Sequence, residues 1–358
     1  MAAYTTIDDP EAYFQVELYT GDGSGQSTTF DGDTNMQPDW VWIKERSGDE
    51  PHAIFDSVRG VQKHLDSAST TAEETVSTSL TAFDSDGFTV GSWSRVNGSS
   101  ETYVAWCWKA GTSFTNDASA TSVGNTDSSG SASSTAGFSI ATYAGVGSSL
   151  DVVVKHGLSV VPAVMIIKNL SSDSWAVYHH KNTAAPETDY LKLDTNSATT
   201  DDADAAETWH DTAPTSAVFT AGDFSATNRS GNNHIGYFWN EVQGFSKFGT
   251  FQGNGANDGP TINTGFRPAF VMVKATSRTG NWGMNDNKRD PYNLTSHTAD
   301  ANNATDSDDT AIRTDLLSNG FKIRTDSYNW NGDCETYVYM AFAEAPFVNS
   351  NEVPCNAR

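Results

Sequence analysis

The chain repeats one order of sequence blocks three times, and this repetition limits the possible folds more than any other feature. An aromatic-x-Gly-x-Gly-small motif starts at Tyr19, Tyr143 and Phe251. A second block runs from a proline to a lysine six residues later, at 38–44, 162–168 and 268–274. Offsets between separate blocks also match, since Trp108 and Trp239 are 131 residues apart, as are Phe88 and Phe219. We therefore interpret the chain as three copies of one unit.

The length of the repeat predicts domains rather than a solenoid. The motifs start 124 and 108 residues apart, whereas solenoid and propeller periods are about 20 to 50 residues. Each unit is long enough to hold a core of its own. We predict a first repeat over 1–109, a Ser/Thr/Gly-rich linker or extended arm over 110–137, a second repeat over 138–246 and a third over 247–358 with a C-terminal tail. The equivalent residues Trp42, Ile166 and Met272 should then lie in equivalent environments.

Composition and residue pattern predict an all-β fold. Only 11 residues are leucine, whereas Thr, Ser, Gly, Val and aromatic residues are plentiful, which disfavours helices and favours strands. Val104, Trp106 and Trp108 alternate with smaller residues, so they share one face of a strand. The dipeptide Asn97-Gly98 follows the strand-like segment 87–90 and indicates a hairpin turn. We expect three tandem antiparallel β-sandwich or jelly-roll-like domains.

Charge and segment composition exclude several function classes. The chain has 21 Lys and Arg against 45 Asp and Glu, a formal net charge of −24. A nucleic-acid partner would need a basic face, and an anionic membrane would repel this chain. The longest uncharged apolar run, 160–167, is interrupted by Pro162, so we expect no membrane insertion. The acidic N-terminal segment does not resemble a secretory signal.

Several of these blocks resemble a known family. The opening segment 4–10, the block 38–44, the segment 55–60 and the ending 343–350 are similar to repeat proteins of marine tailed phages, such as cyanophages and pelagiphages. The resemblance covers essentially the whole chain. It implies a virion-associated, tail-fibre-like protein built from tandem repeats of a domain of unknown function. It supplies no catalytic residues.

The repeated lysines Lys44, Lys168 and Lys274 are candidate binding residues, because each ends a strand-like apolar block. One interpretation is that they bind sugars or neighbouring subunits. The alternative, which we favour, is a strand-end lysine whose stem packs while its amine reaches water.

Trp93 is the candidate aromatic binding residue. It lies between the turn signals at Gly91 and Asn97, and recognition residues concentrate on loops. Stacking on a sugar ring is its functional interpretation, and a place in the core is the alternative.

We expect no metal, no cofactor and no catalytic residues. The three cysteines show no CxxC spacing, and the histidines show no metal-binding spacing. Asp31-Gly-Asp33 and Asp84-Ser-Asp86 resemble parts of calcium loops but lack the rest of the EF-hand pattern. No GxSxG or P-loop motif is present. Solvated acidic surface is therefore the favoured interpretation of these aspartates.

Three functions remain open from the sequence. We predict a non-enzymatic virion structural protein, assembled in the host cytoplasm, that is associated with a tail fibre or binds a host-surface glycan or envelope protein. Repetition would turn weak contacts into avidity. The alternative is a capsid decoration or adaptor protein that packs on other virion proteins, and a remote alternative is a glycan-active enzyme. A homotrimer is the assembly that joining a tail fibre would favour.

Overall fold

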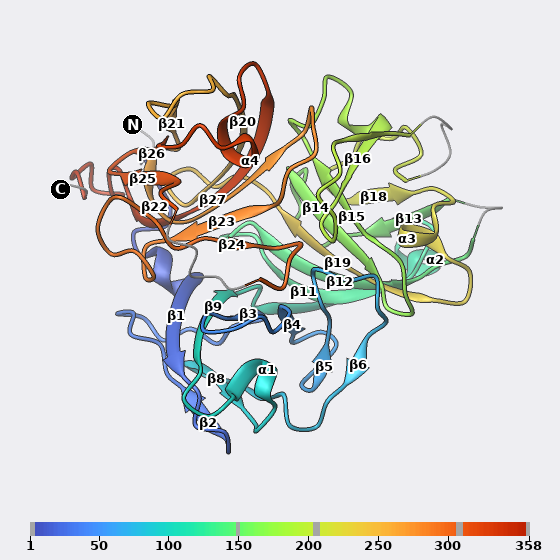
Figure 1. Ribbon diagram of the computed structural model, residues 1–358. Helices are drawn as coiled ribbons and strands as arrows, with labels where there is room; N and C mark the ends of the chain where they lie inside the picture. Colours follow the sequence, from blue (N-terminus) through green and yellow to red (C-terminus); the bar gives the residue numbers. More distant parts are fainter. Residues whose placement is uncertain (1–3, 148–150, 203–207, 306–310, 356–358) are drawn as a thin grey trace.

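The computed structural model describes residues 4–147, 151–202, 208–305 and 311–355, and it consists mainly of antiparallel sheets (Figure 1). The predicted all-β sandwich class is confirmed. Each repeat contributes one large sheet whose four principal strands follow the same order, and one small sheet that covers its outer face. The three repeats form the three lobes of Figure 1, in blue to cyan, green to yellow, and orange to red.

The first repeat forms the large sheet β1-β9-β3-β4. Its strands are β1 (Phe14–Thr20), β9 (Thr102–Trp108), β3 (Trp40–Glu45) and β4 (Ala53–Asp56). The small sheet consists of β2 (Gln26–Thr28), β8 (Gly87–Val90) and β7 (Leu80–Asp84), and a separate hairpin consists of β5 (Lys63–His64) and β6 (Glu74–Thr75). The short helices are η1 (Pro10–Ala12) and α1 (Ser94–Asn97).

The second repeat forms an eight-stranded sheet with the order β10-β11-β12-β19-β14-β15-β16-β17. The strands are β10 (Thr112–Asn116), β11 (Ser128–Ser133), β12 (Phe138–Ala144), β19 (Asn233–Trp239), β14 (Val164–Asn169), β15 (Trp175–His179), β16 (Asp189–Lys192) and β17 (Thr200–Asp201). The small sheet consists of β13 (Val152–Lys155) and β18 (Val218–Ala221). The short helices are α2 (Ala118–Thr121), η2 (Pro186–Thr188) and α3 (Ser225–Asn228).

The third repeat forms the sheet β20-β27-β22-β23-β24. Its strands are β20 (Ser246–Gln252), β27 (Thr336–Pro346), β22 (Phe266–Ala275), β23 (Gly283–Asp286) and β24 (Ala299–Asp300). The small sheet consists of β21 (Thr261–Asn263), β26 (Gly320–Ile323) and β25 (Thr314–Leu317), and α4 (Tyr328–Asn331) precedes β27.

The segment 110–137 was expected to be a linker or an extended arm. The linker prediction is wrong, because this segment contains strands β10 and β11. β11 pairs with β12 and β10 pairs with β11, so the segment extends the large sheet of the second repeat. Its small residues suit close packing, since a Cβ at Gly130 would come within 1.9 Å of the carbonyl oxygen of Ile140. Backbone pairing therefore orders a segment whose side chains are too small to form a core.

The alternation predicted in β9 is confirmed, and it explains why both faces of the large sheets are buried. Val104, Trp106 and Trp108 belong to a hydrophobic cluster shared by all three repeats. The intervening Tyr103 and Ala105 belong to a second cluster, beneath the small sheet of the first repeat. Each face of β9 thus packs against a different layer.

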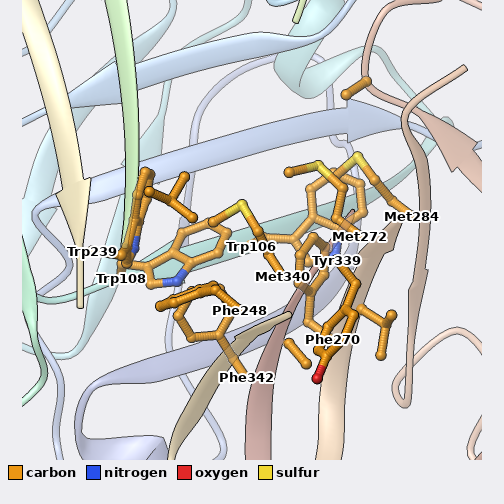
Figure 2. Close-up of a cluster of buried hydrophobic side chains, with 14 of the residues drawn as sticks. Trp106, Trp108, Trp239, Phe248, Phe270, Met272, Met284, Tyr339, Met340 and Phe342 are labelled. Atoms are coloured by element: carbon orange, nitrogen blue, oxygen red, sulfur yellow. The ribbon is translucent and has the colours of Figure 1, made fainter. Parts of the chain in front are cut away.

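The shared cluster lies where the three large sheets meet, and Figure 2 shows its aromatic and methionine side chains from β9, β19, β20, β22, β23 and β27. Trp42, Ile166 and Met272 all lie in this cluster, opposite Trp106, Tyr237 and Met340 of the central strands. Their predicted equivalence is confirmed. The repeats therefore share an interior instead of each holding a wholly separate one, because one face of every large sheet carries large apolar side chains.

One polar contact between repeats recurs in the same sense around the molecule. In each repeat, one ring nitrogen donates a hydrogen bond to a backbone carbonyl of the preceding lobe. The donor side chain lies at the start of β15, just before β23 or just before β4. These pairs are Trp175 Nε1 to Asp66 O at 2.9 Å, Trp282 Nε1 to Lys192 O at 2.8 Å, and His52 Nε2 to Asp300 O at 3.0 Å. Trp42 Nε1 donates to His52 Nδ1, which leaves His52 Nε2 as the donor. The second repeat thus contacts the first, the third contacts the second, and the first contacts the third.

Buried carboxylates form further contacts at two of these boundaries. Tyr237 donates its hydroxyl to Asp56 Oδ2 at 2.7 Å, and Trp106 Nε1 donates to Asp286 Oδ2 at 3.1 Å. Each carboxylate also binds the arginine three residues later, Arg59 or Arg289. A buried carboxylate needs such partners, because desolvation of an unpaired charge is costly.

Candidate functional site

The repeated lysines are buried anchors rather than surface groups. Lys44, Lys168 and Lys274 are all 0% exposed. Lys44 donates to the carbonyl oxygens of Glu45 and Gly48, at 2.7 and 3.1 Å, and Lys274 donates to that of Ala275 at 2.7 Å. Both interpretations from the sequence are therefore corrected, since these amines reach neither water nor a ligand site. Burial lowers the pKa of Lys274 to about 7 and that of Lys168 to about 8.

Trp93 packs against two other side chains and is only partly exposed. The Arg95 guanidinium carbon lies 4.9 Å from its ring centroid, and the His64 ring lies 4.8 Å away, edge to face. The side chain is half-buried against the outer cluster of the first repeat. This geometry does not favour the stacking role proposed for Trp93 from the sequence.

Neither predicted calcium-loop fragment is arranged as a cation site. Asp31 pairs with Lys288 at 2.7 Å, Asp86 Oδ1 accepts from Met36 N, and Asp84 Oδ2 accepts from Thr89 Oγ1. Among the residues that the structure describes, no three His, Cys, Asp or Glu side chains come together at metal-binding distance. No helix in the same part of the chain is both long and apolar enough to cross a bilayer.

Each repeat builds a loop tip on one buried asparagine. Asn97, Asn228 and Asn331 are 0% exposed and end the one-turn helices α1, α3 and α4. Each side-chain carbonyl accepts a backbone N–H from the Gly-x-Gly loop of its repeat. The donors are Asp22 at 2.9 Å, Val146 at 2.8 Å and Asn254 at 2.8 Å. The repeated motif thus encodes a rigid loop, and these three tips lie in different lobes of Figure 1.

A tyrosine braces two of these tips. Tyr103 donates to Ser94 O and accepts from Gly98 N, and Tyr337 donates to Tyr328 O and accepts from Gly332 N. The second repeat has His234 at this place, which accepts from Arg229 N at 3.3 Å. The hairpin turn predicted at Asn97-Gly98 is wrong. Asn97 ends a helical turn, and Gly98 has a φ of −62°, outside the left-handed region that a two-residue hairpin turn uses.

The tip of the third repeat carries an open hollow of about 550 Å³. It is lined by Gly255, Asp326, Ser327, Tyr328, Asn329 and Asp333. Tyr328 is 63% exposed, and the Arg278 guanidinium carbon lies 4.3 Å from its ring centroid. The guanidinium fixes one side of the ring, while most of the tyrosine surface stays open.

Polar groups around this hollow are available to a ligand. Asn329 Oδ1 accepts from Asn281 N at 3.4 Å, which leaves its NH₂ group to donate. Asp326 and Asp333 are exposed; within the described residues, the Asp326 carboxylate has no hydrogen-bond or ion-pair partner, and Asp333 accepts only a weak thiol contact from Cys334. The arrangement offers an aromatic surface, two acceptor groups and one donor group.

The other two tips lack Tyr328 and Asp333 at equivalent positions. The repeats align on the buried asparagines Asn97, Asn228 and Asn331. In this alignment Tyr328 corresponds to Ser94 and Ser225, and Asp333 corresponds to Ser99 and Ser230. Sequence reasoning missed Tyr328 because it followed the similarities between repeats. The available signal was this difference, a tyrosine in one repeat where the other two have serine.

Two further hollows flank the edge strand β10. Their volumes are about 390 and 450 Å³, and they share Ser113 and Phe114. Their linings consist mostly of Ser, Thr and Gly, with Lys155 on one side and Asp39 on the other. Phe114 is half-buried, and its ring packs against Gly130 and Gly157 within the protein.

Comparison with known proteins supports one family assignment. A family model described as a domain of unknown function (DUF7483) matches residues 9–346. The chain belongs to this family. The match spans all three large sheets, so the family comprises the whole arrangement rather than a single repeat. No curated protein and no solved structure matches the chain.

Proposed function

We propose that this DUF7483 protein is a non-enzymatic virion protein that binds the host cell surface, as a component associated with a tail fibre. The observation that carries the proposal is the open hollow at the third loop tip, where Tyr328 and several unpaired polar groups face solvent. Loop tips held by buried asparagines keep such a surface preorganised, which lowers the entropic cost of binding. The net charge of −24 limits nonspecific adhesion to anionic envelopes.

The proposal is tested with labelled virions and with the purified chain. We expect labelled antibody to this protein to decorate the tail region, and fluorescent full-length protein to bind host cells saturably. An acidic protein of similar size and charge is the control for nonspecific adhesion. Saturable binding to host cells should persist in moderate salt, because a contact through an aromatic ring is screened little. Absence of cell binding at all protein concentrations would contradict the host-binding role.

Capsid decoration is the second candidate function, and the edge strand β10 favours it. β10 ends the eight-stranded sheet, and residues 110–116 carry no charge in a strongly acidic chain. An uncharged edge strand can pair with a strand of a neighbouring protein. The same labelling separates the two roles, since a decoration protein would be abundant on the head and absent from the tail.

A further inference from the structure

We infer that the hollow at the third loop tip is a binding site for an uncharged pyranose sugar, which stacks on Tyr328. The inference rests on the proposed host-binding function and gives it a site and a ligand class. The site consists of Tyr328, Asp326, Ser327, Asn329 and Asp333, and we call it the Tyr328 site.

The exposed ring is the first argument. Tyr328 is 63% exposed on a loop whose backbone is held by Tyr337 and Asn331. An exposed aromatic ring on a rigid support can bury apolar area at low entropic cost. Arg278 covers one side of the ring, so a ligand must use the open side and the hollow beside it. The C–H face of a pyranose is flat, apolar and of similar size to this ring.

The arrangement of polar groups is the second argument. A pyranose presents hydroxyls around its rim that both donate and accept hydrogen bonds. Asp326 and Asp333 can accept from hydroxyls, and such O–H···O⁻ bonds are stronger than neutral ones. The free NH₂ group of Asn329 can donate to a hydroxyl or ring oxygen. A few convergent polar groups beside one apolar surface are typical of small-molecule sites.

Charge restricts the ligand class. Two carboxylates line the hollow, and the chain as a whole is strongly acidic, so an anionic sugar such as a uronic acid is repelled. A quaternary ammonium ligand would use an aromatic cage. Tyr328 is the single aromatic residue in the lining, and the Arg278 cation already lies against its ring. An uncharged sugar fits both conditions.

The other repeats provide the variants. Tyr328→Ser and Asp333→Ser install the residues that both other tips have in the same loop. Because Tyr328 and Asp333 are exposed, we expect both full-length variants to fold with unchanged melting temperatures. Tyr328→Phe keeps the ring and removes only its hydroxyl. Tyr292→Ser is the matched control, since Tyr292 is 80% exposed on another loop of the third repeat.

The experiment is ligand-observed NMR of the full chain with methyl glycosides of glucose, galactose, mannose and N-acetylglucosamine, and with methyl glucuronide and choline as charged probes. We expect at least one neutral glycoside to bind with a dissociation constant on the order of 1 mM. Tyr328→Ser should weaken this binding about tenfold or more, Asp333→Ser roughly threefold to tenfold, and Tyr328→Phe and Tyr292→Ser less than about threefold.

Other outcomes would overturn the inference in distinguishable ways. Binding of methyl glucuronide or choline in preference to every neutral glycoside would contradict the ligand class. Neutral-sugar binding that Tyr328→Ser and Asp333→Ser leave unchanged would place the site elsewhere. Host-cell binding without any binding of these sugars would end the inference and leave the proposed function standing. Tyr328-dependent sugar binding without host-cell binding would support the sugar site and contradict the proposed host-binding function.

Discussion

A lysine amine at the end of a buried strand loses its hydration, and carbonyl oxygens must replace that water. Lys44 has two such acceptors, from Glu45 and Gly48, in the turn that follows its strand. Lys168 likewise binds the carbonyl oxygens of Thr70 and Asp173. At the residue scale, the repeated lysine thus ties a strand end to nearby loops, and the stem packs inside the sheet.

Burial makes the contribution of Lys274 to stability depend on pH. Its pKa falls from 10.5 to about 7 in the folded protein. Between these values the unfolded chain binds a proton that the folded chain does not, so this residue makes the free energy of unfolding rise with pH. Its destabilising effect is complete below about pH 7 and disappears above the unfolded pKa.

Lys274→Met should therefore stabilise the protein most at or below pH 7, by roughly 3 kcal/mol. The gain should shrink steadily as the pH rises to 10, because the unfolded lysine then loses its own proton. Urea unfolding of both proteins at pH 6, 8 and 10 measures the difference. The control is Lys181→Met on the exposed surface, which should change stability by less than about 0.5 kcal/mol. A gain independent of pH would contradict the effect of burial on Lys274.

At the scale of elements, one asparagine side chain organises each loop tip. Asn331 donates to Asn254 Oδ1, Ala256 O and Thr325 O, and it accepts from Asn254 N. Asn331→Ala should lower the free energy of unfolding by about 2–4 kcal/mol, because buried polar groups of the loop lose their partner. Thermal or urea unfolding measures this loss. Asn329→Ala, beside it but half-buried, should cost less than about 1 kcal/mol, and equal losses would show that the position, not the bonding, matters.

Strand blocks could be predicted from the sequence because their signal is local. The alternation in β9 and the proline-to-lysine blocks depend on side-chain size and spacing, and both form strands as predicted. The β10–β11 segment could not be recognised this way, because its order comes from backbone pairing with β12. Asn97-Gly98 misled for a related reason: the asparagine side chain serves a loop 75 residues away in sequence.

Local sequence patterns could not predict the candidate site at Tyr328. Tyr328 stays 63% exposed although Arg278, from a loop 50 positions earlier, lies against one side of its ring. Trp93 looked similar from its flanking turn signals, yet Arg95 and His64 cover it. The exposure of a loop aromatic depends in part on neighbours distant in sequence, such as His64 beside Trp93. Aligning the repeats would have indicated only which residue differs.

At the scale of the whole molecule, the three repeats complete one another. Their large sheets share a cluster that includes Trp108, Trp239 and Phe342. Each boundary also carries a hydrogen bond to a backbone carbonyl of the preceding repeat, such as the bond from Trp282 to Lys192. A repeat removed from its neighbours would expose its aromatic inner face and lose these bonds, and exposed apolar patches of this kind cause association.

We therefore expect the full chain to unfold in a single transition and its second repeat to fail on its own. In urea, tryptophan fluorescence and far-UV circular dichroism of the full chain should change together, since no sheet can lose its inner face without exposing the others. A fragment of residues 110–246, which keeps the complete eight-stranded sheet, should aggregate or bind the dye ANS strongly, because its face with Phe138, Ile166 and Trp239 is uncovered. A soluble, monomeric fragment with a cooperative melting transition would instead mean that each repeat closes its own interior.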